Sequence, residues 1–188
     1  NKEIDPKDHS AVTRSLENLK LELEPFGKTP KIIINGNNVT DAIRSPIVTS
    51  LVSEVSALSS VREALTRQQK EIGHSGGLVA EGRDIGTTVF PNADLKIFLN
   101  ASTAERARRR IIDLKKQGFA VPDSNDLEAQ IDKRDQQDST RAISPLVKAK
   151  DAKELITDGM NIEEVIQVVE ELFRMKVPEE VWPTPSRK

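Results

Sequence analysis

The chain has 188 residues, of which 36% are hydrophobic and 31% are charged, and its formal net charge is −2. This composition is typical of a globular protein with one sizeable core, or one core and a smaller lobe. The balanced charge gives no support for nonspecific attraction to nucleic acid or to a membrane surface, so any cationic site has to be a local cluster. The absence of cysteine excludes disulfides, thiolate catalysis and cysteine-containing zinc sites.

The same features predict the location of the protein. No apolar run approaches the length of a membrane span, and the first thirty residues lack a signal-peptide core. We therefore expect a cytoplasmic protein, in keeping with the lack of cysteine, and a monomer, because no long apolar stripe is evident. His9 and His74 lack metal-ligand spacing, so we predict no protein metal site. The sequence starts without Met inside a charged helical pattern, which indicates a fragment or a processed product.

The first part of the chain predicts helices around a small antiparallel hairpin. In chain order we expect a helix over Ala11–Leu19, strands in Leu21–Glu24 and Lys31–Val39, a helix from Ser45-Pro46 and a helix over Ser60–Ile72. Asn35-Gly36 is a typical hairpin turn. Ser45 supplies a side-chain cap, and Pro46 is preset for the first helical turn.

The second part alternates strands with helices. We expect strands at Leu78–Ala80, Leu95–Leu99 and Glu154–Thr157, and helices from Ser102 to Gly118, from Asp123 to about Asp138 and from Asn161 onward. Ser102 with Glu105 matches a capping box, and Asn125 with Glu128 is a plausible cap pair. Strands separated by helices indicate a parallel α/β sheet, with the early hairpin as an inserted lobe. The proline-rich end from Pro178 to Lys188 is a predicted linker.

A candidate ligand site follows the Leu78–Ala80 run, where Glu81, Gly82, Arg83 and Asp84 come next in the sequence. In open parallel α/β sheets, ligands bind outside the carboxyl ends of the strands. Gly82 allows a sharp turn and close approach of a ligand. The alternative is an ordinary strand followed by a polar turn.

Two helices carry clustered arginines. Arg106, Arg109, Arg110 and Asp113 share one helical face. Guanidinium groups bind phosphate oxygens with two parallel hydrogen bonds, so the cluster favours a polyanion. A solvated helix face is the alternative.

The next helix places Arg134, Asp138 and Arg141 at i, i+4 and i+7. This face has almost no apolar content, as expected of a mobile lid that carries positive charge onto a ligand. A surface ion-pair ladder is the alternative, since exposed pairs at this spacing are common.

One apparent phosphate-binding motif fails on inspection. Gly27-Lys28-Thr29 imitates the end of a phosphate-binding loop, but that motif needs a glycine where Glu22 stands and a helix where Pro30 follows. The 188 residues therefore contain no Gly-rich phosphate loop.

Taken together, several segments resemble bacterial cytidylate (CMP) kinases in order and spacing, from near residue 3 to about residue 174. These segments are Val61–Leu65, Glu81–Pro91, Lys96–Leu99, Glu105–Arg110 and Arg134–Arg141. The resemblance implies the P-loop-type nucleoside monophosphate kinase fold, an α/β fold with a parallel sheet flanked by helices, an inserted antiparallel lobe and a helical lid. It implies a monophosphate-binding lobe with core helices at 1–75, core strands at 76–104, a lid at 105–145, a core strand with the C-terminal helix at 146–176, and a tail at 177–188.

The resemblance also implies an activity and its residues. The expected reaction is in-line, ATP-dependent phosphorylation of CMP, and of dCMP, in pyrimidine nucleotide metabolism, with Mg2+ bound mainly by nucleotide phosphates. By this resemblance, cytosine would be contacted by Ser53, Arg62 and Asp84, and the ribose would be contacted by Arg134 and Asp138. The acceptor phosphate would be bound by Arg83 and Arg141. The ATP phosphates would be approached by Arg109 and Arg110. Arg83, Arg134 and Arg141 would be the catalytic cations.

The chain departs from the family pattern at its start. The strand and Gly-rich loop with which members begin are absent, together with a segment holding another acceptor-phosphate arginine. Without that central strand, the backbone edges of Leu78–Ala80 and Glu154–Thr157 would be unpaired. We therefore expect the C-terminal part of a CMP kinase, inactive alone. A truncated nucleotide-binding fragment is the alternative, and the net charge of −2 argues against a nucleic-acid binder.

Overall fold

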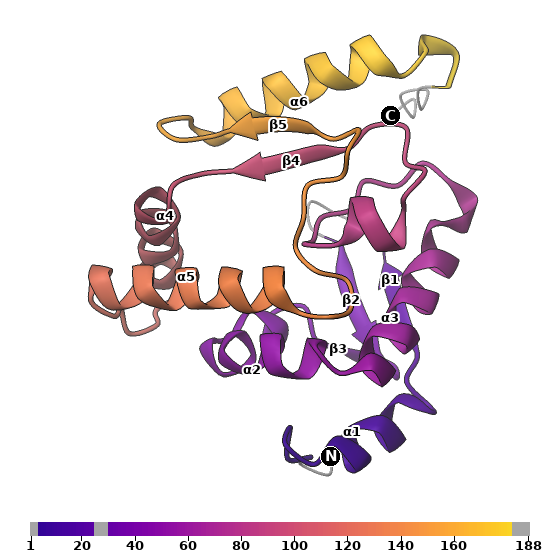
Figure 1. The fold of residues 1–188 in the computed structure, drawn as a ribbon, viewed down its shortest axis with the longest axis vertical. Helices are drawn as coiled ribbons and strands as arrows, with labels where there is room; N and C mark the ends of the chain where they lie inside the picture. The colour runs from indigo at the N-terminus through magenta and orange to yellow at the C-terminus, as the bar shows by residue number, and fades with distance from the viewer. Residues whose placement is uncertain (1–3, 25–29, 182–188) are drawn as a thin grey trace. The chain divides into compact units, whose positions relative to one another are not determined.

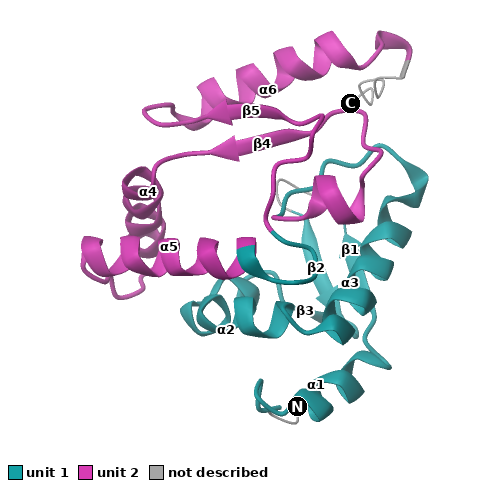
Figure 2. Cartoon of the chain, in the orientation of Figure 1, with its two compact units in different colours: residues 1–82, 140–145 teal, residues 83–139, 146–188 magenta. Residues whose placement is uncertain are grey.

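The computed structural model describes residues 4–24 and 30–181. The chain divides into two compact units, one from residues 1–82 and 140–145 and the other from residues 83–139 and 146–188 (Figure 2). Each unit has its own sheet (Figure 1). The segment Gly27–Thr29 and the end of the predicted tail, from Trp182 on, lie outside the described residues.

The first unit is built from helices and a three-stranded antiparallel sheet in the order β1-β2-β3. Its elements are α1 (His9–Leu16), β1 (Leu21–Glu24), β2 (Lys31–Ile34), β3 (Asn37–Asn38), α2 (Pro46–Ser56) and α3 (Ser59–Ile72). Asn35 and Gly36, which join β2 to β3, have φ values of 49° and 78°. A two-residue hairpin turn of type I′ has positive φ at both positions, so the structure confirms the predicted turn.

The core of the first unit is small. Val12 of α1, Ile33 of β2, and Val61 and Ala64 of α3 are its buried apolar side chains among the described residues. Gln68 of α3 adds a polar link, because its amide accepts a hydrogen bond from the Leu21 N–H at 2.7 Å and donates to the Leu19 carbonyl at 2.9 Å. This pair of bonds satisfies backbone groups at the start of β1 and fixes α3 beside them.

The second unit contains two parallel strands joined by two helices. Its elements are a π-helical turn (Ile85–Val89), β4 (Ile97–Asn100), α4 (Thr103–Lys116), α5 (Ser124–Thr140), β5 (Lys153–Ile156), α6 (Ile162–Lys176) and a 3-10 turn (Glu179–Val181). β4 and β5 pair in register from Ile97 opposite Lys153 to Asn100 opposite Ile156. The parallel pairing with a helical crossover confirms the predicted α/β class.

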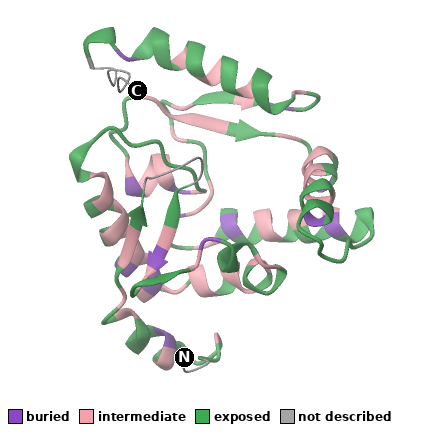
Figure 3. Cartoon of the chain, turned by 180° about the vertical axis from the view of Figure 1, so that it is seen from behind, coloured by how far each residue is buried: buried purple, intermediate pink, exposed green. Residues whose placement is uncertain are grey.

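The strand pair is only partly covered by the described residues. Leu99 of β4, Ile156 of β5 and Ile162 of α6 are 58%, 64% and 73% exposed. Figure 3 shows α6 and the two strands mainly in the exposed and intermediate classes. Apolar residues on a two-stranded sheet are ordinarily buried by further layers. Among the described helices, none has the length and apolarity to cross a membrane.

The prediction of a strand over Leu78–Ala80 is wrong. These residues have no regular secondary structure, and Val79 is 98% exposed. A strand exists only through hydrogen bonds to a neighbour. Within the described residues, β4 pairs with β5 alone, so no strand is placed to receive this segment.

The hydrogen bonds at the helix N-termini can be compared with the N-cap residues predicted from the sequence. Ser102 accepts a hydrogen bond from the Glu105 N–H at 3.3 Å, as predicted for the start of α4. Asn161 caps α6 with a complete capping box, since Asn161 and Glu164 each accept from the other's backbone N–H at 2.9 and 2.8 Å. The predicted cap Asn125 is wrong. Asp123 accepts from the Asn125 N–H at 2.8 Å, so the capping group lies two residues earlier.

We predict that Asn161→Ala frays the first turn of α6. The loss of an N-cap side chain costs about 1 kcal/mol, whereas glycine at the same position costs only a few tenths. Hydrogen exchange of the first-turn amides, measured by mass spectrometry on the complete protein that carries this chain, should accelerate several-fold in Asn161→Ala and much less in Asn161→Gly. Equal exchange in the two variants would show that the cap is not the stabilising feature.

Candidate functional site

The predicted site residues are distributed over both units. Arg83, Asp84, Arg109, Arg110, Arg134 and Asp138 belong to the second unit, and Ser53, Arg62 and Arg141 belong to the first. Within the second unit the structure brings Arg83, Arg134 and Asp138 together. It adds Asp135, for which we predicted no role, and Arg106, which we predicted only as part of a helix face suited to a polyanion.

We call Arg83, Arg106, Arg134, Asp135 and Asp138 the arginine–aspartate cluster. Arg83 donates from Nη1 to Asp135 Oδ1 at 2.7 Å, and its Nε lies 2.9 Å from Asp138 Oδ2 as an ion pair. Arg106 donates from Nη2 to Asp135 Oδ1 at 3.1 Å and from Nη1 to Asp135 Oδ2. Arg134 Nε lies 3.8 Å from Asp138 Oδ2. Positive and negative groups therefore alternate along the cluster.

Helical spacing explains how α4 and α5 build this cluster. Asp135 and Asp138 are three residues apart on α5 and so lie on the same side of the helix. Thr103 and Arg106 are likewise three apart on α4. Thr103 Oγ1 donates to Asp132 Oδ1 at 2.6 Å, one turn before the Arg106–Asp135 contact. The links between the two helices thus repeat at one-turn spacing.

Partial burial and charge shift the pKa values within the cluster. Burial raises the pKa of Asp135, but hydrogen bonds from Arg106 and Arg83 outweigh it, so the net pKa is lowered. The hydrogen bond to Asp135 raises the pKa of Arg106. Burial, followed by repulsion from Arg83, lowers the pKa of Arg134. Asp135 is therefore favoured as a carboxylate, whereas burial disfavours the charged form of Arg134.

The cluster carries a surplus of positive charge. Its three arginines face two aspartates, and the Asp138 side chain is only 3% exposed. Arg134 Nε is buried and makes no hydrogen bond within the described residues. A half-buried cation short of partners is stabilised by an anion. The geometry therefore suits a bound phosphate or another anionic group.

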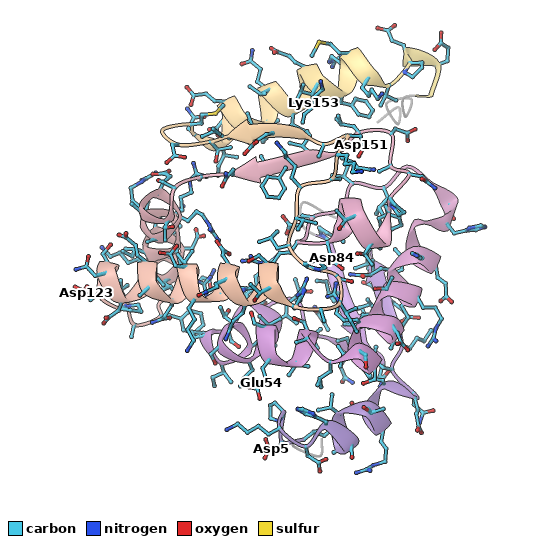
Figure 4. The ribbon with its side chains drawn as sticks, viewed as in Figure 1. Asp5, Glu54, Asp84, Asp123, Asp151 and Lys153 are labelled. Atoms are coloured by element: carbon cyan, nitrogen blue, oxygen red, sulfur yellow. The ribbon has the colours of Figure 1, made fainter. Side chains whose placement is uncertain are left out.

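Asp84 directly follows Arg83 of the cluster in the sequence and is labelled in Figure 4. Its side chain is buried, and the residue is 7% exposed. Its carbonyl accepts hydrogen bonds from the N–H groups of Thr88 at 2.8 Å and Thr87 at 3.3 Å, which anchors the π-helical turn. Within that turn, a Cβ on Gly86 would lie 3.4 Å from Lys96 Cδ. A larger side chain would therefore compete with Lys96 for the same space.

Lys96 is a buried cation with its own counter-charge. Its side chain is 7% exposed, and Nζ donates to both carboxylate oxygens of Asp151, at 2.9 and 2.8 Å. The Pro91 carbonyl accepts a third hydrogen bond. Asp151 stands just before β5 (Figure 4), so Lys96 ties the segment before β4 to the start of β5.

The two arginines predicted for the ATP phosphates differ in their surroundings. Arg109 donates to Glu105 at 2.7 Å and to Thr157 Oγ1 at 3.0 Å, and it also contacts the Thr157 carbonyl. It therefore links α4 to the connection between β5 and α6. Arg110 makes no hydrogen bond or ion pair within the described part of the chain. Their predicted contact with ATP stays a prediction.

In the first unit, Ser53 is the most informative residue. Its Oγ is buried in α2 and has no hydrogen-bond partner among the described residues. Buried hydroxyl groups ordinarily find a partner, so the Ser53 hydroxyl is available to one that lies outside the described residues. Arg62 lies on α3, and Arg141 donates from Nε to the Ser144 carbonyl at 2.6 Å. Across residues 4–24 and 30–181, no group of acidic or histidine side chains converges to hold a metal ion.

A parallel strand pair flanked by helices, a separate small antiparallel sheet and arginine-rich helices together define a nucleoside monophosphate kinase fold. The sequence profile of the cytidylate kinase family matches residues 1–175. The chain belongs to the cytidylate kinase family.

Several similar proteins are bifunctional pantoate ligase/cytidylate kinases. Those of Prochlorococcus marinus strains MIT 9303 and MIT 9313 are 62% and 61% identical to the chain, over 185 and 186 residues. That of Synechococcus sp. strain CC9902 is 55% identical over 185 residues. Each match covers 98% of this chain but only 37–38% of the relative. The chain thus spans little more than a third of the length of these relatives.

We predict an unusually acidic Glu105. Hydrogen bonds from Arg108 lower its pKa, burial opposes them, and Arg109 lowers it further, to about 2 from an ordinary 4.5. The stabilisation that the carboxylate provides is therefore complete above pH 4.5 and is lost as the pH falls through about 2.

Carbon-13 NMR titration of the Glu105 carboxyl should show this low midpoint. In the Arg108→Gln/Arg109→Gln double variant the midpoint should rise toward 4.5, and Arg108→Gln alone should account for most of the change. A wild-type midpoint near 4.5 would contradict the contacts of Glu105.

Proposed function

We propose that the complete protein carrying this chain transfers a phosphoryl group from ATP to CMP, and to dCMP, and forms the diphosphate. The observation that carries the proposal is the arginine–aspartate cluster, whose surplus positive charge includes the incompletely neutralised Arg134. Membership of the cytidylate kinase family supports the choice of reaction. The proposal places the protein in the cytoplasm, as a monomer in pyrimidine nucleotide metabolism.

The proposed roles are those that the family resemblance implies for these positions. Arg83, Arg134 and Arg141 bind and stabilise the phosphoryl oxygens, Asp138 accepts from the ribose hydroxyls, Ser53, Arg62 and Asp84 read the base, and Arg109 and Arg110 approach the ATP phosphates. None of these groups forms a covalent intermediate. Guanidinium groups fixed beforehand stabilise the charge that develops during transfer without reorganising at that moment.

Magnesium enters the proposal through the nucleotides. The family resemblance implies that the nucleotide phosphates would provide most of the ligands of the ion. Mg2+ would neutralise negative charge that develops on the nucleotide phosphates during transfer. The protein's own contribution is to hold the acceptor phosphate against its arginines.

A second proposal concerns the chain by itself. Its 188 residues contain no Gly-rich phosphate loop, and the exposed apolar residues of β4, β5 and α6 indicate an incomplete core. We propose that the isolated chain does not transfer phosphate.

Coupled spectroscopic assay of both forms tests these two proposals. The complete protein should phosphorylate CMP in the presence of ATP and Mg2+, and the isolated chain should show no turnover above background. Turnover by the isolated chain would disprove the need for a phosphate loop. Inactivity of the complete protein toward CMP and dCMP would disprove the proposed reaction.

We predict that Ser53→Ala weakens recognition of the base. The buried hydroxyl lacks a protein partner, and loss of one hydrogen bond to a neutral ligand group costs about 1 kcal/mol, or roughly fivefold in affinity. The KM for CMP should rise by about that factor, and the KM for ATP should stay the same. Ser50→Ala, which changes an exposed serine on the same helix, is the control. An unchanged KM for CMP in Ser53→Ala would remove Ser53 from the site.

A further inference from the structure

Arg106 and Asp135 have no role in the proposed reaction, yet both belong to the arginine–aspartate cluster. We infer that Asp135 is a positioning residue that sets the orientation of Arg83, and that Arg106 holds Asp135 in the orientation this requires. The inference rests on the proposed function, in which Arg83 binds the acceptor phosphate.

The contacts of Arg83 explain why its orientation is defined. Nη1 donates to Asp135 and Nε pairs with Asp138, so two carboxylates hold one planar guanidinium at two nitrogens. These two contacts, together with the covalent bond from Nε to Cδ, restrict the direction and the plane of the group. Nη2 takes no part in these contacts and is the nitrogen left to a phosphate oxygen. Without Asp135, the guanidinium would keep only its contact at Nε and could rotate.

Asp135 is itself fixed by Arg106. Both nitrogens of the Arg106 fork donate to the carboxylate, Nη2 to Oδ1 at 3.1 Å and Nη1 to Oδ2. A bidentate pair of this kind restricts the carboxylate plane as well as stabilising its charge. The side chains of Arg83, Asp135 and Arg106 are 26%, 27% and 32% exposed. They are therefore less screened than pairs on an open surface.

An explanation based on charge alone predicts that loss of the Asp135 carboxylate strengthens phosphate binding, whereas positioning predicts that it weakens catalysis. The cluster has three positive and two negative groups. Removal of the Asp135 charge would raise the surplus from one to two positive charges and would attract an anion more strongly. Positioning predicts weaker catalysis from the same change, because Arg83 would lose its fixed direction. The two explanations are therefore separable by one substitution.

A purely structural role, in which Asp135 only joins α5 to α4, is separable as well. Thr103 and Asp132 make a second link between these helices, one turn away, and the described contacts of Asp132 do not include Arg83. Asp132→Asn removes a carboxylate from the same helix and weakens the same helix pair. It is therefore a matched control for Asp135→Asn.

The test measures kcat and KM for CMP and for ATP in the complete protein, for wild type, Asp135→Asn, Arg106→Lys and Asp132→Asn. We expect kcat/KM for CMP to fall about tenfold or more in Asp135→Asn, as misplacement of a reacting group does, with the KM for ATP unchanged. Arg106→Lys keeps the charge but loses the two-nitrogen fork of the guanidinium, so its kcat/KM for CMP should fall by a similar factor. The kcat/KM of Asp132→Asn for CMP should stay within about twofold of the wild-type value, as for an ordinary surface substitution.

Three kinetic results would overturn the inference. These are an unchanged or increased kcat/KM for CMP in Asp135→Asn, an equal loss in Asp132→Asn, and wild-type values in Arg106→Lys. Failure of the wild-type protein to phosphorylate CMP would instead disprove the proposed function. The orientation of Arg83 is then read by nitrogen-15 NMR of arginine side chains, where separate Arg83 Nη signals should merge in Asp135→Asn. Signals that stay separate in that variant would also overturn the inference.

Discussion

The contact of Arg83 with two carboxylates of α5 is the interaction on which the second unit's candidate site depends. Arg83 itself lies in an irregular segment, outside any helix or strand. Asp135 and Asp138 fix its side chain because helical geometry presents both on one side of α5. A cation that is three-quarters buried is tolerated only with such partners. The helix therefore determines where the guanidinium of an otherwise unsupported segment lies.

Sequence reasoning succeeded where the determining contacts are local. Ser45, Ser102 and Asn161 cap the helices that follow them, and Asn35-Gly36 forms the hairpin turn. These structures depend on groups within four residues of one another, which a sequence pattern records directly. The strand predicted at Leu78–Ala80 failed for the complementary reason. Its apolar residues are suited to a strand, but a strand needs a partner that the described residues do not provide.

The candidate site shows the same division. The i, i+4 spacing of Arg134 and Asp138 predicted their proximity, and the structure confirms it. The link between Arg106 and Asp135 joins residues 29 apart in sequence, so no local pattern could reveal it. The sequence does show that Asp135 follows Arg134 and that Arg106 lies three residues after Thr103. Only the packing of α4 against α5 shows that the two side chains contact each other. The roles in base and nucleotide recognition came from the family resemblance, not from spacing.

Gly86 and Lys96 show how a packing contact can constrain the variation of a sequence. The lysine stem occupies the space beside the glycine, while its charged end is held at the start of β5. An alanine at position 86 would still fit in ordinary contact. A bulkier residue would have to displace the Lys96 side chain and so break its hydrogen bonds to Asp151, which is 55 residues away in sequence. The side chains at positions 86 and 96 compete for the same space. We therefore expect the two positions to covary in evolution, with a larger residue at 86 accompanied by a shorter one at 96.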